Sequence, residues 1–233
     1  MGMINQEKNK MYVVNDMPSF SQEPIVEQVV ENKSYLLLKR TMDILCSLIG
    51  IIVLLPLFLI IAASIKYEGF RYPVLFKQKR VGKNGKVFSM YKFRSMVWNA
   101  EELKLSLITQ NEASGPVFKI KLDPRVTKVG KFIRRTSLDE LPQLINVLKG
   151  EMSLVGPRPP LPDEVEQYTQ YEAQRISVTP GLTCYWQING RSNITFKEWV
   201  EMDLKYIRER NILVDIKLIL KTILVLFGSK DAY

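Results

Sequence analysis

The sequence contains no histidine and only two cysteines, Cys46 and Cys184. The missing histidine excludes a Ser–His or Cys–His nucleophile and any histidine-ligated metal site. Two cysteines are too few for a disulfide framework or a four-cysteine zinc site, and they favour a reducing compartment. Acid–base and nucleophilic chemistry therefore falls to carboxylates, lysine or tyrosine.

The charge of the chain is concentrated in its middle. The 233 residues are 46% hydrophobic and 24% charged, as expected for one folded domain with appendages. Residues 71–135 carry 16 basic and 4 acidic side chains, a net charge of +12, whereas the whole chain has +9. Such a field attracts nucleic acid, an acidic membrane surface or phosphorylated small molecules. No P-loop lysine motif, dinucleotide fingerprint or nucleic-acid-binding motif is present in the sequence.

Residues 44–65 form an uncharged run of 22 residues, the strongest segment-level signal in the chain. A straight transmembrane helix needs ~20 apolar residues, so the run is long enough to cross a bilayer. A signal peptide fits less well, because its apolar region is usually ~7–15 residues long. A third interpretation is a re-entrant hairpin that enters the membrane and returns to the same side.

Two features favour the hairpin. Pro56 lies in the middle of the run, where proline removes a helix hydrogen bond and clashes with the preceding turn. Basic residues flank the run on both sides, at Lys39 and Arg40 and at Lys66 and Arg71, and basic flanks favour the cytoplasmic side. These features alone leave the hairpin and the straight span open, because membrane helices tolerate proline.

The remaining patterns predict a helix-rich α/β domain with a small sheet. Asn84-Gly85 is a hairpin-turn signal, and alternation over 87–93 indicates the strand that follows it. Helices are expected at 99–109, 137–150, 195–210 and 212–227. Gly150 is expected to end the second of these helices, and Thr195 with Glu198 fits a capping box at the start of the third. The last of these is apolar but carries three charges, which suits a helix lying in the membrane interface.

We therefore expect a membrane-associated protein with two parts. Residues 1–34 are polar and lack periodicity, which predicts a mobile leader. Residues 35–233 form the domain, which divides into a membrane segment at 36–66, a middle part at 67–211 and an interfacial helix and tail at 212–233.

Asp139 and Glu140 are the strongest candidates for chemistry. Ser137-x-x-Glu140 also fits a capping box, and acids in a first helical turn suit the helix dipole, so a purely structural role competes. The functional interpretation rests on the preceding Arg134 and Arg135 and on the basic segment, which together suit a phosphate and a divalent cation. A carboxylate can act as a nucleophile toward phosphorus.

Other motifs offer cations and amides for binding. Arg158 lies between prolines, so it is either a rigidly presented clamp for a diphosphate or a solvated loop residue. Lys92 and Arg94 share one side of a predicted strand, with Phe93 on the other. The segment ending in Gln187 and Arg191 is either a packed turn or a surface for a base or sugar.

Taken together, these motifs resemble the bacterial sugar transferase family of monotopic polyprenyl-phosphate phosphoglycosyl transferases. The similarity is carried by KFRSM, GPVFKI, DPRVTKVGKFIRR and SLDELPQLINVLKGEMSLVGPRP, and it extends over about 35–233. Longer members carry a multi-span N-terminal membrane region that this sequence does not include. In the family a serine often precedes the proline of the helix break, whereas here Leu55 precedes Pro56.

The resemblance implies a fold, a function and a site. It implies a monotopic α/β domain in which the segment at 36–66 is a re-entrant membrane helix and residues 67–211 are the catalytic part. It implies transfer of a sugar 1-phosphate from a UDP-sugar to polyprenyl phosphate, with Mg²⁺, at the cytoplasmic face of a bacterial cell membrane. The family's Asp–Glu pair falls on Asp139 and Glu140, which are the expected catalytic and metal-binding residues. The expected substrate-binding residues are Lys92, Arg94, Arg125, Arg134, Arg158, Gln187 and Arg191. The resemblance leaves open the sugar and whether the protein forms a homodimer.

Two other functions fit parts of the sequence. A non-catalytic membrane-anchored adaptor would use the basic segment to bind anionic lipid or a partner. A nucleic-acid binder would use the same charge, but the apolar run at 44–65 argues against it. We therefore expect membrane lipid, and no nucleic acid, among the partners.

Overall fold

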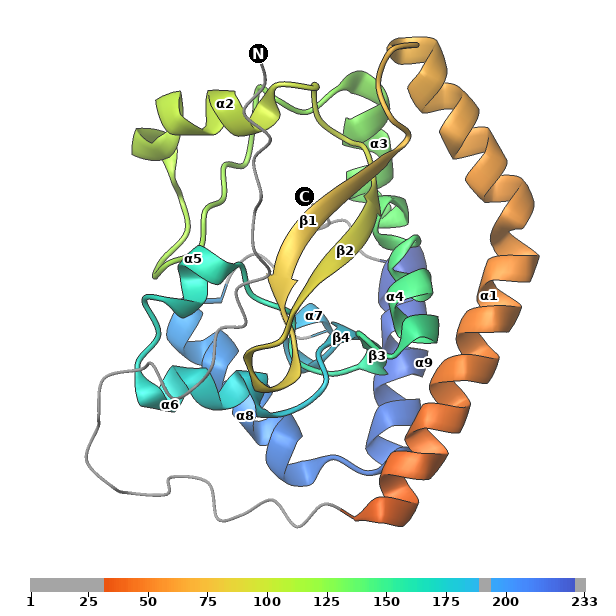
Figure 1. Ribbon diagram of the computed structural model, residues 1–233, viewed down its shortest axis with the longest axis vertical. Helices are drawn as coiled ribbons and strands as arrows, with labels where there is room; N and C mark the ends of the chain where they lie inside the picture. The colour runs from red at the N-terminus through yellow and green to blue at the C-terminus, as the bar shows by residue number, and fades with distance from the viewer. Residues whose placement is uncertain (1–31, 189–193, 229–233) are drawn as a thin grey trace, which may run out of the picture.

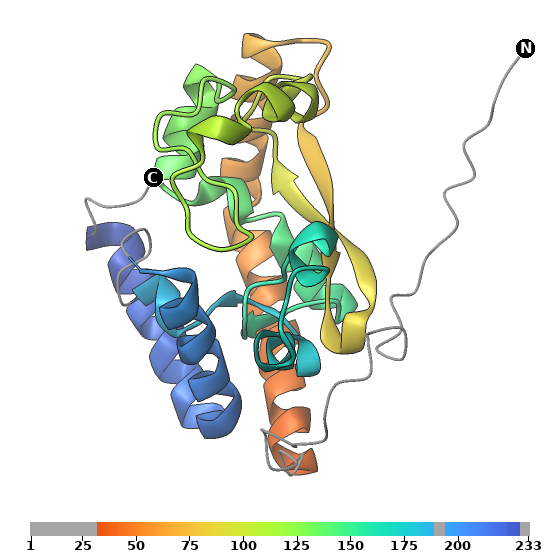
Figure 2. The same ribbon diagram turned by 90° about the vertical axis from the view of Figure 1, so that its left-hand side faces the viewer.

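The computed structural model describes residues 32–188 and 194–228 of the chain. Figure 1 shows a long helix, α1 (Lys33–Glu68), along one edge, with helix α4 (Gln143–Lys149) between it and the hairpin of strands β1 (Leu75–Val81) and β2 (Val87–Phe93). Figure 2 shows helices α8 (Phe196–Glu209) and α9 (Ile212–Gly228) on one flank of the molecule and the hairpin on the opposite flank. The α-helices of the described residues are α1 (Lys33–Glu68), α2 (Ala100–Ser106), α3 (Lys128–Arg135), α4 (Gln143–Lys149), α5 (Pro162–Val165), α6 (Gln170–Ala173), α7 (Tyr185–Ile188), α8 (Phe196–Glu209) and α9 (Ile212–Gly228). Short 3₁₀ turns fall at Lys83–Gly85, Ile108–Gln110, Leu138–Glu140 and Gln174–Ser177.

Two small sheets form the β part of the described chain. Strands β1 (Leu75–Val81) and β2 (Val87–Phe93) pair antiparallel, and Asn84 and Gly85 supply the positive φ angles of 55° and 80° in the turn between them. Strands β3 (Ser153–Val155) and β4 (Gly181–Thr183) pair in parallel. The predicted turn, the strand that follows it and the helix-rich α/β class are confirmed.

The largest hydrophobic core joins β3, which pairs with β4, to helices α8 and α9. Val155, Leu204, Ile207 and Leu218 are among its fully buried side chains. The predicted capping box at the start of α8 is confirmed, because Thr195 accepts from the Glu198 amide while the Glu198 carboxylate accepts from Thr195. The core therefore fixes β3 and β4 against the two C-terminal helices.

Helix α1 is one uninterrupted helix of 36 residues with Pro56 inside it. The expected break into two half-helices at Pro56 is therefore corrected: the helix bows in its middle but continues (Figure 1). Proline removes one intrahelical hydrogen bond and bends the helix, and the turns on either side keep their own bonds. A bowed helix is compatible both with a helix that crosses a bilayer and with one that enters it and returns.

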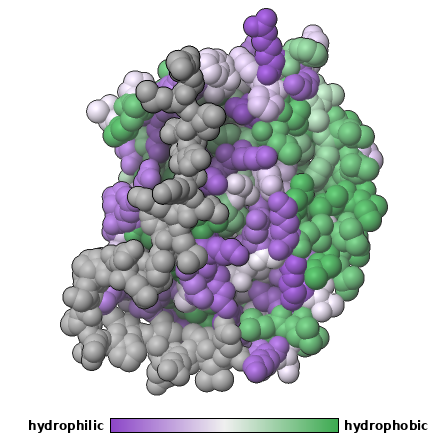
Figure 3. Space-filling model, viewed as in Figure 1, coloured by the Kyte–Doolittle hydropathy of each residue, from purple (hydrophilic) through white to green (hydrophobic). Residues whose placement is uncertain are grey.

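Helix α1 presents a broad apolar surface. By length and composition it is the one helix of the described chain that is apolar enough to cross a membrane. Large exposed side chains follow it from Leu37 to Ile60, and α9 exposes Leu213, Leu220 and Leu224. Figure 3 shows the resulting hydrophobic band along the α1 edge of the molecule. Apolar patches of this extent mark a surface that meets lipid or protein.

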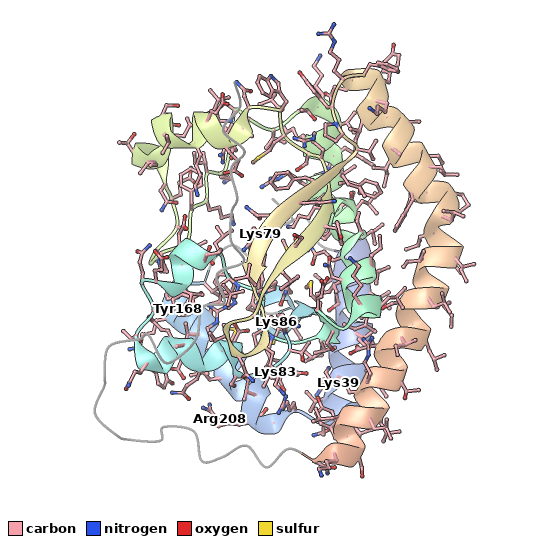
Figure 4. The ribbon with its side chains drawn as sticks, viewed as in Figure 1. Lys39, Lys79, Lys83, Lys86, Tyr168 and Arg208 are labelled. Atoms are coloured by element: carbon pink, nitrogen blue, oxygen red, sulfur yellow. The ribbon has the colours of Figure 1, made fainter. Side chains whose placement is uncertain are left out.

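The first turns of α1 are attached to the body by buried polar groups. The Lys39 ammonium donates to an Asp215 carboxylate oxygen of α9 at 2.8 Å and to the Val155 carbonyl of β3 at 2.9 Å. The Tyr206 hydroxyl of α8 donates to Asp215 at 2.8 Å. Asp43 accepts from the Ser153 hydroxyl and the Leu154 amide at 3.1 and 2.9 Å. Figure 4 shows Lys39 on the side of α1 that faces the body.

These contacts change the interpretation of the basic residues that precede the apolar run and of the charged Asp215 in the last helix. Arg40 donates to the carbonyls of Val147 and Leu148 at the end of α4, so neither Lys39 nor Arg40 is a free cation beside the membrane. Asp215 is fully buried instead of lying on the polar face of an interfacial helix. Half of the basic flanks used to favour the hairpin therefore serve internal attachment.

Lys39→Met is expected to lower the free energy of unfolding by about 3–5 kcal/mol, because it leaves the Asp215 carboxylate buried without its cation. Adding Asp215→Asn is expected to recover part of that loss. Thermal unfolding in detergent measures both variants. Lys66→Met, at the exposed end of the same helix, is the control and is expected to change stability by less than about 0.5 kcal/mol. Equal stability of Lys39→Met and the wild type would contradict this role of the ion pair.

Candidate active site

The turn Leu138–Glu140 presents the two candidate carboxylates between α3 and α4. It begins at Ser137, which has a φ of 56° and makes no side-chain cap. The capping box proposed from the sequence is therefore wrong: the left-handed backbone of Ser137 starts a tight turn, and the helix itself begins later, at Gln143. The predicted glycine stop is confirmed, because Gly150 ends α4 with a φ of 81°. A capping role does not account for Glu140.

Glu140 is bound instead by a cation from the neighbouring strand. The Lys92 ammonium of β2 lies 2.6 Å from the Glu140 carboxylate. The Glu140 side chain keeps 42% of its surface exposed. Asp139 is buried, with 7% exposed. The adjacent acids therefore point into different surroundings, as their spacing predicts.

Their surroundings push the two pKa values apart. Burial raises the pKa of Asp139 to about 6, and the negative charge of Glu140 adds to this, while Lys92 and Arg134 oppose it. Burial also opposes ionisation of Glu140, but the Lys92 ammonium, with Arg158 and Arg80, lowers the pKa of Glu140 to about 2. Two neighbouring carboxyl groups whose pKa values are shifted in opposite directions are typical of acids with different roles in one site.

The loop that carries Arg158 is held rigidly by backbone bonds. The Gly156 amide donates to the Thr183 carbonyl at 2.9 Å, and the Gly181 amide donates to the Pro157 carbonyl at 2.9 Å. The two glycines approach so closely that a Cβ on Gly181 would overlap backbone atoms of Gly156. On the other side, the Val81 amide of β1 donates to the Pro160 carbonyl at 2.9 Å.

Arg158 itself is free to bind an anion. Its half-buried guanidinium makes no hydrogen bond or ion pair with any residue that the structure describes, and it lies over the ring of Trp199. Its charge lowers the pKa of Glu140, so it lies near the Glu140 carboxylate. A cation held in place without a counter-ion suits recognition of a phosphate.

Two further cations belong to this site, and the sequence analysis missed both. Arg80 of β1 is buried and donates to the Pro159 carbonyl at 3.0 Å. Lys119 is half-buried, and its pKa is lowered by burial and by the charges of Arg158 and Arg134. Lys119 lies in the GPVFKI motif, so the sequence indicated this segment. No local pattern distinguished Lys119 from the other residues of the motif.

The structure brings some of the expected binding residues to the carboxylates and places others elsewhere. Lys92, Arg134 and Arg158 surround the pair. Arg94 donates to the Pro73 carbonyl and lies over Phe76. Two of the remaining three make contacts elsewhere: Arg125 forms an ion pair with Asp123 at 2.6 Å, and Gln187 donates to the Leu182 carbonyl at 3.1 Å. Arg191 lies outside the described residues.

The acids of this site fit a substrate-bridged metal ion better than a protein-enclosed one. Among residues 32–188 and 194–228 no group of three or more acidic or cysteine side chains gathers in one place. Mg²⁺ commonly binds through one or two carboxylates together with substrate phosphates. The Asp139–Glu140 pair, with Glu140 ionised, offers that donor set.

An anchored apolar helix, a split carboxylate pair and a cluster of cations are together suited to chemistry on phosphates at a membrane. The family model described as Bacterial sugar transferase matches residues 34–229, and the chain belongs to this family.

Relatives of the chain carry names that refer to sugar transfer or to exopolysaccharide production. The chain is 49% identical over 198 residues to the galactosyl transferase CpsE of Streptococcus agalactiae serotype III (strain NEM316), covering 84% of this chain and 44% of the relative. It is 40% identical over 221 residues to the undecaprenyl-phosphate galactose phosphotransferase of Salmonella typhimurium, covering 92% and 46%. It is 37% identical over 199 residues to the exopolysaccharide production protein ExoY of Rhizobium meliloti (strain 1021), covering 84% and 88%. The chain thus spans under half the length of the first two relatives.

In isotope-edited infrared spectra, Asp139 is expected to titrate near pH 6. Asp139→Asn identifies the band by removing it. Lys92→Met is expected to move the titration to higher pH, because loss of the cation destabilises the carboxylate form. Lys79→Met is the control, since Lys79 is an exposed cation of the same hairpin. An unchanged Asp139 titration in Lys92→Met would contradict the electrostatic arrangement.

Proposed function

We propose that the protein transfers a sugar 1-phosphate from a UDP-sugar to membrane polyprenyl phosphate and releases UMP. This would be the first membrane step in the synthesis of an extracellular polysaccharide or glycan. The observation that carries the proposal is the Asp139–Glu140 pair, one acid buried and one bound by Lys92, beside a cation without a counter-ion. Membership of the bacterial sugar transferase family and the names of the relatives support it.

The first displacement uses Asp139 as nucleophile. A carboxylate oxygen of Asp139 forms a bond to the phosphorus that carries the sugar, and the bond from that phosphorus to the bridging oxygen breaks. UMP leaves with the bonding electrons, and the sugar phosphate remains on Asp139 as an acyl phosphate. With a pKa of about 6, Asp139 is mostly ionised at neutral pH and more basic than an ordinary aspartate.

The second displacement regenerates the enzyme. A phosphate oxygen of the polyprenyl phosphate attacks the same phosphorus, and the bond from phosphorus to the Asp139 oxygen breaks. The product is a polyprenyl diphosphate sugar, and Asp139 returns as a carboxylate. The intermediate lets one soluble and one lipid-bound substrate react in sequence.

The surrounding residues stabilise the developing charge. Arg158 can bridge two phosphate oxygens with its planar fork, and Arg134 and Lys119 add positive charge near it. Glu140, held ionised by Lys92, and Asp139 would hold Mg²⁺ together with the substrate phosphates. Bound Mg²⁺ would supply neutralisation of the diphosphate charge.

The membrane placement follows from the substrates. We propose that α1 enters the membrane from the cytoplasmic side and that the bow around Pro56 returns its end to the same side. Both ends of the helix, and the catalytic part attached to them, would then face cytoplasmic UDP-sugar. The exposed apolar side chains of α1 and α9 would lie in the lipid beside the acceptor.

Incubation with a panel of UDP-sugars and polyprenyl phosphate, scored for UMP release, tests the activity. Asp139→Asn is expected to abolish release, because an amide is a poor nucleophile toward phosphorus. Without acceptor, label from a β-³²P UDP-sugar is expected to stay on the wild-type protein and to be missing from the variant. Asp163→Asn, an exposed acid on α5, is the matched control with normal turnover.

The same experiment separates the enzyme from the adaptor alternative. An adaptor would release no UMP with any donor in the panel and would bind anionic vesicles equally well with Asp139→Asn. Robust turnover by Asp139→Asn would reject Asp139 as the nucleophile while leaving the activity in place.

Cysteine labelling tests the topology of α1. In a background without Cys46 and Cys184, single substitutions Ser34→Cys and Tyr67→Cys place thiols at the two ends of the helix. Both are expected to resist an impermeant thiol reagent until the cells are opened. Labelling of either position from outside would show that α1 crosses the membrane. Pro56→Ala is expected to straighten the helix and to shift some molecules toward that crossing form.

A further inference from the structure

Among the residues that the structure describes, the aromatic ring that the Arg158 guanidinium lies over is that of Trp199. The guanidinium carbon of Arg158 lies 5.6 Å from the centroid of the Trp199 ring, within the range of a cation–π interaction. Arg158 has no hydrogen bond or ion pair among the described residues, so no polar partner there fixes its direction. The backbone hydrogen bonds of the loop fix the main chain of Arg158, and the Trp199 ring is the contact that can fix its side chain.

Trp199 is a partly buried residue of α8 that packs against the largest core. Its ring lies 4.8 Å from the Trp186 ring of α7 and 6.2 Å from the Phe196 ring. The Arg175 guanidinium lies 4.7 Å from the Trp199 centroid. A ring packed on several sides cannot turn freely, so the face that it offers to Arg158 is fixed.

Arg175 is fixed in turn by buried partners. It forms an ion pair with Asp203 of α8 at 2.6 Å and donates to the Tyr168 hydroxyl at 3.0 Å. Figure 4 shows Tyr168 on the segment between α5 and α6. Arg175 is therefore committed to the core, whereas Arg158, the second cation on this ring, keeps its donors available.

We infer that Trp199 is a positioning residue for the proposed transfer, which sets the orientation of the Arg158 guanidinium toward the substrate diphosphate. The inference rests on the proposed function. Its physical basis is that a guanidinium stacked on a ring loses rotational freedom but keeps its in-plane N–H donors for phosphate oxygens. In this proposal Trp199 acts on the diphosphate through Arg158, whose guanidinium it contacts.

A double-mutant cycle between Trp199 and Arg158 tests the inference, with UMP release as the readout. Arg158→Lys is expected to lose about tenfold in kcat/KM, because lysine keeps the charge but loses the planar fork. Trp199→Leu is expected to lose about as much, mainly in kcat, and Trp199→Phe, which keeps a ring face, clearly less. In the Arg158→Lys background Trp199→Leu is expected to change kcat/KM by less than about twofold, the sign of strong coupling.

Ile207→Val is the matched control, because Ile207 is buried in the same core and lies on α8 about two turns from Trp199. Its effect is expected to multiply with that of Arg158→Lys, as independent sites do. Equal losses from Trp199→Leu in both backgrounds would overturn the inference and make Trp199 a packing residue. If Trp199→Leu fails to fold, the Trp199→Phe cycle decides by the same criterion.

Failure of the inference and failure of the proposed function give different results. A wild-type protein that releases no UMP with any UDP-sugar refutes the function itself. Wild-type turnover that Asp139→Asn abolishes, combined with additive Trp199 and Arg158 effects, leaves the function standing and removes the positioning role.

Discussion

The buried ion pair between Lys39 and Asp215 is the interaction on which the rest of the architecture depends. A charge in the interior is costly unless it is paired and hydrogen-bonded, and here the Tyr206 hydroxyl and the Val155 carbonyl complete the set. The pair joins the membrane helix to the C-terminal helix. Because Val155 directly precedes the loop that carries Arg158, the same contacts fix one end of the candidate active site.

Local patterns were enough to predict the hairpin turn at Asn84 and Gly85, the cap of α8 and the glycine stop of α4. Each depends on residues within a few positions of one another. Local patterns did not predict that α1 continues through Pro56. Proline destabilises a helix, but packing of the rest of α1 against the body can offset that cost. Local patterns also could not predict the Lys39–Asp215 ion pair, because the two residues lie 176 positions apart in the sequence. Counting Lys39 as a membrane-flanking charge assumed that it had no partner.

The candidate active site likewise has features that the sequence predicts and features that only the structure shows. Asp139 and Glu140 could be named from the sequence because they are adjacent and lie in a motif. Their unequal pKa values could not, because they depend on burial and on Lys92, which is 48 residues away. Arg80 escaped notice as one of several basic residues in β1, and only the structure shows that it alone turns inward. Motifs locate a site, and tertiary contacts assign the roles within it.

The cluster of Arg158, Arg134 and Lys119 has a thermodynamic consequence. These cations lie close enough for their charges to lower the pKa of Lys119, and none is paired with a described residue. The fold therefore holds a mutual repulsion that an incoming diphosphate would relieve, so donor binding and folding are linked. Salt screens such repulsion, and the empty protein should gain stability at this site as ionic strength rises, whereas a surface ion pair loses it.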